Sequence, residues 1–174
     1  TFTAPYDGGV AEPVVLQPPA HAEVVVGRHR ALAFKADDAG LACWLLGIRN
    51  TAQLHNHPLR GAIFETWVVT EILKHRTNRG ETAGLYFYRD AQQREVDAVI
   101  ESPGRFTLVE AKSGETIGSK SLDPVRAVAA VLAKRGDIES LTVIGGGVGQ
   151  RRSDVSVVPW NELHRHAATL ARSK

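Results

Sequence analysis

The sequence predicts an α/β domain, in which helices flank a mixed central sheet and an irregular N-terminal extension precedes it. The chain has 174 residues, 43% of them hydrophobic, which is enough for one globular core and too little for two large ones. From residue 61 onward, helical and strand periodicities follow in the order helix, strand, strand, strand, helix, strand. Prolines and glycines crowd residues 1–20, and this segment is therefore expected to be irregular.

Residues 21–60 form a predicted subregion between the irregular segment and the core. Two short strands are expected at Val24–Val26 and Ala31–Phe34, on either side of the basic turn Gly27–Arg30. This subregion also contains a short helix and a loop.

The short helix is predicted to have Asp37 or Asp38 as its N-cap and to end at Gly47. Cys43 lies within it and is expected to be a small buried core residue. Arg49–Pro58 is predicted to be a polar loop. Four apolar side chains recur at helical spacing and should face inward: Leu41, Trp44, Leu45 and Ile48.

Residues 61–174 form the predicted core. Its first half contains a helix over Gly61–Arg76 and an aromatic-rich strand over Leu85–Tyr88. Two further strands, Glu95–Glu101 and Arg105–Ala111, are joined in a hairpin by a Ser-Pro-Gly turn.

The second half of the core begins with a helix. Asp123 and Pro124 are favourable as its N-cap and first helical residue, and Gly136 is placed to end it. Leu141–Ile144 has the composition of a buried strand. Three elements complete the prediction: a flexible turn at Gly145–Gly149, a strand at Val155–Val158 and a helix from about Asn161.

Charged side chains interrupt the two apolar strands of the hairpin. Side chains alternate between the faces of a strand, so Glu110 and Lys112 should project from one side, with Asp97 beside them. The same alternation predicts two sets on the first strand, with Glu95, Asp97 and Val99 on one face and Val96, Ala98 and Ile100 on the other.

Burying an unpaired carboxylate is costly, and two arrangements of these side chains would offset the cost. In the first arrangement, a structural ion pair is formed among Asp97, Glu110 and Lys112. In the second, the two acids hold a divalent cation with Lys112 beside it. The second arrangement is suited to hydrolysing a phosphodiester, because the cation activates water and the lysine stabilises developing charge.

Glu65 is a third acid in an unexpected place. It lies in the middle of an apolar helical arc formed by Val68, Val69, Ile72 and Leu73. If this arc packs on the sheet, Glu65 points inward toward Asp97 and Glu110. The alternative is a Glu65 side chain that reaches the edge of the helix or pairs with Arg76, and the pattern favours neither.

An Asp followed after twelve residues by Glu-Ala-Lys on the next strand resembles the PD-(D/E)XK nuclease signature. That superfamily's core also has the order helix, three strands, helix, strand. Further blocks resemble the uncharacterised carboxy-terminal domain that follows an AAA-type ATPase module in many bacterial and archaeal proteins. The resemblance spans Leu16 to Gly114, and its blocks are LQPPAHAEVVVGRHRALAFKADDAGL, KADDAGLACWLLGI, GAIFETWVVTEILKHR, LYFYRDAQQREVDAVIE and LVEAKSG.

This resemblance implies a restriction-endonuclease-like core with a Mg²⁺ or Mn²⁺ site. Asp97 and Glu110 would be metal ligands, with the Ala111 carbonyl as a further one. Lys112 would be the catalytic lysine, and Glu65 the helix acid that completes the site. ATP would bind only in an upstream module outside this chain.

Three functions are compatible with these patterns. The first is a Mg²⁺-dependent phosphodiesterase acting on DNA as the effector domain of an ATPase. The second is a catalytically inactive docking or DNA-binding module of that ATPase, with Asp97, Glu110 and Lys112 as a buried ion-pair network. The third is a nuclease-like toxin or defence element, which nothing in the sequence separates from the first.

Other motifs favour structural interpretations. GGGVGQRR at Gly145–Arg152 lacks the Gly-Lys-Ser/Thr ending of a phosphate-binding loop and is expected to be a turn. His55 and His57 have no third metal ligand nearby, which favours a solvated loop. The basic clusters Arg28–Arg30 and Arg151–Arg152 are expected to be solvated surface rather than contacts to a phosphate backbone.

The bulk composition limits the setting of the protein. A formal net charge of +2 permits a DNA partner without indicating one. Cys43 is the only cysteine, so no internal disulfide is expected and a reducing compartment is favoured. No apolar run approaches the ~20 residues that a membrane span needs, and the first residues do not resemble a signal peptide. We therefore expect a cytoplasmic location without membrane contact, and the oligomeric state stays open.

Overall fold

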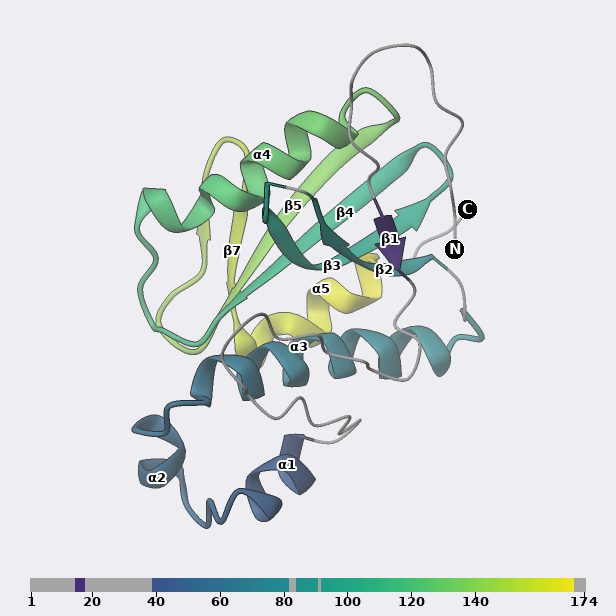
Figure 1. Cartoon of the computed structure of the whole chain (residues 1–174). Helices are drawn as coiled ribbons and strands as arrows, with labels where there is room; N and C mark the ends of the chain where they lie inside the picture. The colour runs from purple at the N-terminus through teal and green to yellow at the C-terminus, as the bar shows by residue number, and fades with distance from the viewer. Residues whose placement is uncertain (1–14, 18–38, 82–83, 91, 171–174) are drawn as a thin grey trace.

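The computed structural model describes residues 15–17, 39–81, 84–90 and 92–170 (Figure 1). These residues form a mixed seven-stranded sheet in the order β1-β2-β3-β4-β5-β7-β6. The strands are β1 (Val15–Gln17), β2 (Leu85–Arg89), β3 (Glu95–Ser102), β4 (Arg105–Lys112), β5 (Asp137–Ile144), β6 (Gln150–Arg151) and β7 (Ser156–Pro159).

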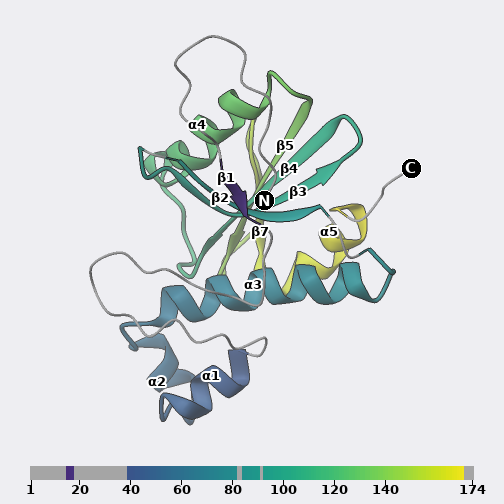
Figure 2. The same ribbon diagram turned by 45° about the vertical axis from the view of Figure 1, so that its right-hand side comes forward.

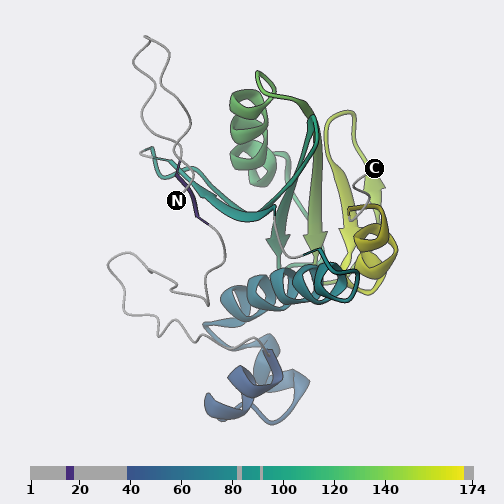
Figure 3. The same ribbon diagram turned by 90° about the vertical axis from the view of Figure 1, so that its right-hand side faces the viewer.

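Helices cover both faces of this sheet, as Figure 3 shows with α4 on one side and α3 with α5 on the other. The helices are α1 (Ala39–Leu45), α2 (Thr51–His55), α3 (Arg60–Thr77), α4 (Asp123–Leu132) and α5 (Leu163–Leu170). The predicted order of helix, three strands, helix and strand is thus confirmed. None of the helices among the described residues is long and apolar enough to cross a membrane.

The sheet changes from antiparallel to parallel pairing at β4. Strands β1 to β4 pair antiparallel in sequence order, whereas β4, β5 and β7 are parallel to one another. Parallel neighbours need a crossover, and α4 provides it between β4 and β5. The carboxyl ends of β4, β5 and β7 therefore meet at one edge, which is where open α/β sheets place their ligands.

Two apolar clusters hold the layers together. The first cluster lies between one face of the sheet and the helices α3 and α5, and it consists of Val68, Ile72, Leu85, Ala98, Ile100, Val109, Ala111, Leu141, Val143, Val158 and Leu163. The second cluster lies between the other face and α4, and it consists of Tyr88, Val96, Val99, Phe106, Leu108, Leu122, Val125, Val128, Leu132 and Val155. Both faces of β3 and β4 are buried, as the apolar composition of these strands predicts.

A bulge in β3 makes one prediction about its faces wrong. Tyr86 pairs with Val99 and Tyr88 with Val96, so three steps on β3 match two on β2. The extra residue resets the alternation, and both valines enter the cluster under α4. Simple alternation had placed Val96 and Val99 on opposite faces.

Four further expectations differ from the structure. Residues 1–20 are not irregular throughout, because β1 pairs antiparallel with β2. The predicted loop Arg49–Pro58 contains α2, which begins where the Asn50 side chain accepts a hydrogen bond from the Gln53 backbone. Leu122 rather than Asp123 is the N-cap of α4, because a 3₁₀ turn leads directly into the helix. Gly136 does not end α4, whose C-cap is Ala133.

The apolar stripe predicted for α1 is only partly buried. Ile48 is buried, but Leu41, Trp44 and Leu45 are exposed because α1 and α2 lie beyond α3, away from the sheet (Figure 2). Cys43 is half-buried rather than fully enclosed. The strands expected at Val24–Val26 and Ala31–Phe34, and the cap at Asp37 or Asp38, lie outside the described residues.

A glycine holds the carboxyl ends of β4 and β5 together. The Gly145 backbone N–H donates to the carbonyls of Lys112 and Gly114 at 2.9 Å each, and a Cβ at Gly145 would overlap the Ser113 carbonyl. Gly145→Ala is therefore expected to lower the free energy of unfolding by about 1–3 kcal/mol, measured by urea denaturation. Gly118→Ala is the matched control, because a Cβ there meets nothing within 4 Å, and an equal loss in both would contradict the interpretation.

Candidate metal and catalytic site

The predicted site residues come together where β3 separates from β4. The pairing of β3 with β4 ends at Ala98, which lies opposite Val109. One residue before Ala98 on β3, the Asp97 side chain accepts a hydrogen bond from β4 in place of a backbone carbonyl. Its Oδ2 accepts a hydrogen bond from the Ala111 N–H at 2.7 Å. The divergence of the strands, together with the bulge, therefore holds the Asp97 carboxylate against β4.

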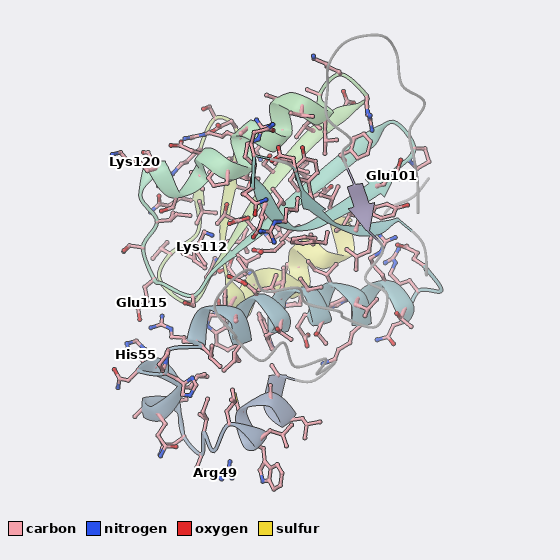
Figure 4. All side chains as sticks on the ribbon, in the orientation of Figure 1. Arg49, His55, Glu101, Lys112, Glu115 and Lys120 are labelled. Carbon is pink, nitrogen blue, oxygen red and sulfur yellow. The ribbon has the colours of Figure 1, made fainter. Side chains whose placement is uncertain are left out.

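Glu110 and Lys112 project from the same side of β4, as predicted. The Lys112 Nζ donates to Glu110 Oε1, and the Glu110 residue is only 5% exposed. The Lys112 side chain keeps 38% of its surface exposed, so the pair is open to solvent on the lysine side. Figure 4 shows Lys112 on the same side of the molecule as Glu115 and His55.

Glu65 approaches the same cluster from α3. Val68 and Ile72 on its helix are buried against the sheet, as the apolar arc predicts. Burial raises the pKa of Glu65, Lys112 lowers it, and Glu110 raises it further, so Glu65 lies within electrostatic reach of both. The alternative partner, Arg76, places its Nη1 3.3 Å from Glu81 Oε2.

The pKa values of the acids are displaced upward. Burial and the nearby charges of Glu110 and Glu65 raise the pKa of Asp97 to about 8, against the lowering effects of the Ala111 hydrogen bond and Lys112. Burial also raises the pKa of Glu110, although the hydrogen bond from Lys112 opposes it. For Lys112 burial lowers the pKa, but the bond to Glu110 and the surrounding acids outweigh it and leave the pKa raised.

Burial is the largest cause of the raised pKa values of the acids, and an imbalance of charge adds to it. Asp97, Glu110 and Glu65 would carry three negative charges when ionised, and Lys112 supplies one positive charge. The net excess of two negative charges equals the charge of one divalent cation. In the absence of a cation, protons on the acids relieve the repulsion.

One buried atom also fits an additional ligand. Within the described part of the chain, Glu110 Oε2 is buried and has no hydrogen-bond partner. No three His, Cys, Asp or Glu side chains of that part are grouped closely enough to hold a metal ion. A cation here would therefore rely on Asp97, Glu110, the Ala111 carbonyl that the resemblance implies, and waters, as Mg²⁺ commonly does.

An arginine that sequence reasoning missed supports the end of β4. Arg60 is the first residue of α3, and its Nη2 donates to the Ser113 carbonyl, directly after Lys112. Its Nη1 lies 3.4 Å from both the Nδ1 and the backbone oxygen of His55. A basic residue at a helix start has no periodic signal, so only the fold reveals this contact.

The weaker motifs have structural roles. The Nδ1 of His57 accepts a hydrogen bond from the Leu59 N–H at 3.1 Å, which occupies one of the ring nitrogens a metal would need. Gly145 begins a turn directly after β5, and Gly147 in it has φ +75°. The Arg152 Nη2 donates to the Ile117 carbonyl at 2.9 Å.

Comparison with known proteins identifies the family. No curated protein that was compared matches the sequence. The family model described as "Domain of unknown function (DUF4143)" matches residues 60–163, from the start of α3 to the start of α5. This range includes the whole acidic cluster; it begins later and extends further than the expected resemblance, which spanned Leu16 to Gly114. A match over more than half of the chain shows that the protein belongs to the DUF4143 family, a domain of unknown function.

Proposed function

We propose that this domain is a Mg²⁺-dependent phosphodiesterase of PD-(D/E)XK type that acts on DNA as the effector domain of an AAA-type ATPase. The observation that carries the proposal is the cluster of three acids around one lysine, all three with raised pKa values. Strongly perturbed groups that gather at the carboxyl edge of a sheet favour a functional site.

The direction of the pKa shifts favours a cation site over a structural ion pair. A carboxylate in a satisfied ion pair has a lowered pKa, because its partner stabilises the ionised form. Asp90 behaves in this way: burial raises its pKa, but hydrogen bonds from Arg94 outweigh that and leave it lowered. Asp97 shows the opposite shift, because burial and the charges of Glu110 and Glu65 outweigh the Ala111 hydrogen bond and Lys112.

Each residue has a distinct role in the proposed reaction. Asp97 and Glu110 would hold the cation together with the Ala111 carbonyl. When bound, Mg²⁺ supplies Lewis-acid stabilisation of the phosphate and lowers the pKa of a water. The half-exposed Lys112 ammonium donates hydrogen bonds to the attacking oxygen and stabilises negative charge as it develops on the phosphate. Glu65 would accept a hydrogen bond from the attacking water and orient it in line with the P–O bond that breaks, and the proton that the water loses would pass through solvent to the leaving oxygen.

The surroundings of Lys112 support an anionic substrate. The half-exposed Lys112 and the Arg60 guanidinium at Ser113 place positive charge on the open side of the cluster. A phosphodiester backbone approaching there would find these two cations, as phosphate contacts in nucleic-acid complexes commonly use.

A second candidate, a docking module of the ATPase, is favoured by a separate observation. Leu41, Trp44 and Leu45 of α1 are 51%, 62% and 50% exposed and form an apolar surface on the far side of α3. Exposed apolar groups of this kind suit contact with another protein. This surface lies apart from the acidic cluster, so the two candidates do not exclude each other.

Lys112→Met tests the proposal. Plasmid cleavage in Mg²⁺ is expected to fall roughly 100-fold or more, because a donor to the developing charge is lost. Affinity for Mg²⁺ or Mn²⁺, measured by calorimetry, should stay equal or rise, since a competing positive charge leaves Glu110. Lys120→Met, an exposed lysine before α4, is the control and should retain cleavage. Native protein that binds no cation, or cleavage that survives Lys112→Met, would rule the proposal out.

A further inference from the structure

Two buried polar atoms without hydrogen-bond partners lie on neighbouring strands. Within the described part of the chain they are Glu110 Oε2 on β4 and Thr142 Oγ1 on β5. The parallel register pairs Glu110 directly with Thr142, so the two side chains project from the same face of the sheet. Thr142 is fully buried, with 0% exposed surface.

The position of Thr142 makes Glu110 its natural polar neighbour. On its other side the register pairs Thr142 with Val157, which is apolar and buried. Along β5, Leu141 and Val143 belong to the core on the opposite face, and the neighbours on the face of Thr142 are Ser140 and Ile144, each two residues away. Of the two residues paired directly with Thr142, Glu110 on β4 and Val157 on β7, Glu110 is the polar one.

A buried hydroxyl without a hydrogen-bond partner lowers the stability of the fold at this position. Valine has nearly the same shape as threonine and would fill the same space without burying a polar atom. A buried hydroxyl is stabilising only when it has a partner, and buried waters in proteins commonly bridge such groups. The two unpartnered atoms, on Thr142 and Glu110, thus point to one shared partner.

We propose that Thr142 is a positioning residue of the cation site, and that its hydroxyl and Glu110 Oε2 hold one buried water between them. This inference rests on the proposed function, because it concerns the same carboxylate. Lys112 holds Glu110 Oε1 and the water holds Oε2, so both ends of the carboxylate are fixed. Each carboxylate oxygen of Glu110 retains one further lone pair. Because the plane of the carboxylate is fixed, these lone pairs point toward the cation.

Thr142→Val is the direct test, with affinity for Mn²⁺ measured by calorimetry and the thermal midpoint measured on metal-free protein. Affinity is expected to fall roughly tenfold, as for groups that orient a metal ligand. The metal-free midpoint should fall slightly, because the variant removes one hydrogen bond from the buried water that Glu110 Oε2 shares. Thr142→Ser, which keeps the hydroxyl, should restore affinity to within about twofold of native.

Thr107→Val is the matched control. Thr107 is a buried threonine on β4 that faces the opposite side of the sheet from Glu110, so its substitution should leave Mn²⁺ affinity unchanged. If native protein and Thr142→Val bind Mn²⁺ equally well, the role of Thr142 is refuted and the cation site remains. If native protein binds no Mn²⁺, the proposed function fails first, and the role of Thr142 with it.

Discussion

Asp97→Asn is expected to weaken Mg²⁺ and Mn²⁺ binding roughly 100-fold or more, and to reduce plasmid cleavage to background. The substitution removes one of the two carboxylates placed to hold the cation. Asparagine keeps an oxygen that accepts from the Ala111 N–H, so the bond that fixes this side chain is retained. Calorimetric titration and plasmid cleavage on the same samples measure both effects.

The same variant should be more stable than native protein without metal. Asp97 is ionised in the unfolded chain at neutral pH but costly to ionise in the fold, and an asparagine at this position carries no such cost. Asp90→Asn is the matched control, because Arg94 holds the ionised form of Asp90 through a hydrogen bond of 2.5 Å. It should lose roughly 1–3 kcal/mol of stability and keep its metal affinity. An Asp97→Asn variant that binds metal normally and is less stable would identify Asp97 as a structural residue.

The metal-free protein is expected to lose stability as the pH rises from about 4 to about 8. The folded pKa of Asp97 is about 8, and its ordinary value is 3.8. Between these values the folded chain retains a proton that the unfolded chain has released, so the free energy of unfolding falls with increasing pH. One such proton changes it by at most about 1.4 kcal/mol per pH unit. Thermal midpoints measured in buffers from pH 5 to pH 8 follow the change.

Two comparisons isolate the source of this pH dependence. Saturating Mg²⁺ should remove most of the decline, because the cation replaces the proton as the balancing charge. Asp97→Asn should show a flatter profile than native protein. The lowered pKa values of Asp90 and Asp154 act below pH 4, where their stabilisation is lost on acidification, and do not affect this window. A native midpoint that is constant or rises from pH 5 to pH 8 would contradict the charge excess.

The fold was predictable where composition and periodicity were strong. The core helices and strands from α3 to α5 lie at the predicted segments, because their apolar residues repeat at the required spacing, although β5 begins at Asp137 rather than at the predicted Leu141. Three of the misses depend on contacts with distant segments. The strand β1 is stabilised by pairing with β2, about seventy residues away, and two-residue β6 by pairing with β7. The exposure of Trp44 depends on where α1 packs, which its own stripe does not determine.

The site was predictable as a set of residues but not as a geometry. Carboxylates within apolar strands drew attention to Asp97 and Glu110, and the helical arc drew attention to Glu65. Thr142 gave the same signal, a polar residue in the apolar strand Leu141–Ile144, but threonine is common in strands and did not stand out. The orientation of Asp97 depends on the bulge in β3, which alternation alone cannot anticipate.

The bulge also determines which changes in chain length this hairpin tolerates. The Pro103–Gly104 turn lies at the far end of β3 and β4 from the acids, so residues added there lengthen a loop without turning any strand residue over. A single residue inserted between Val99 and Glu101, or deleted there, would invert Asp97 relative to Glu110. Related chains and engineered variants should therefore vary in length at the turn. Between the bulge and the end of β3, the number of residues should change only by even numbers.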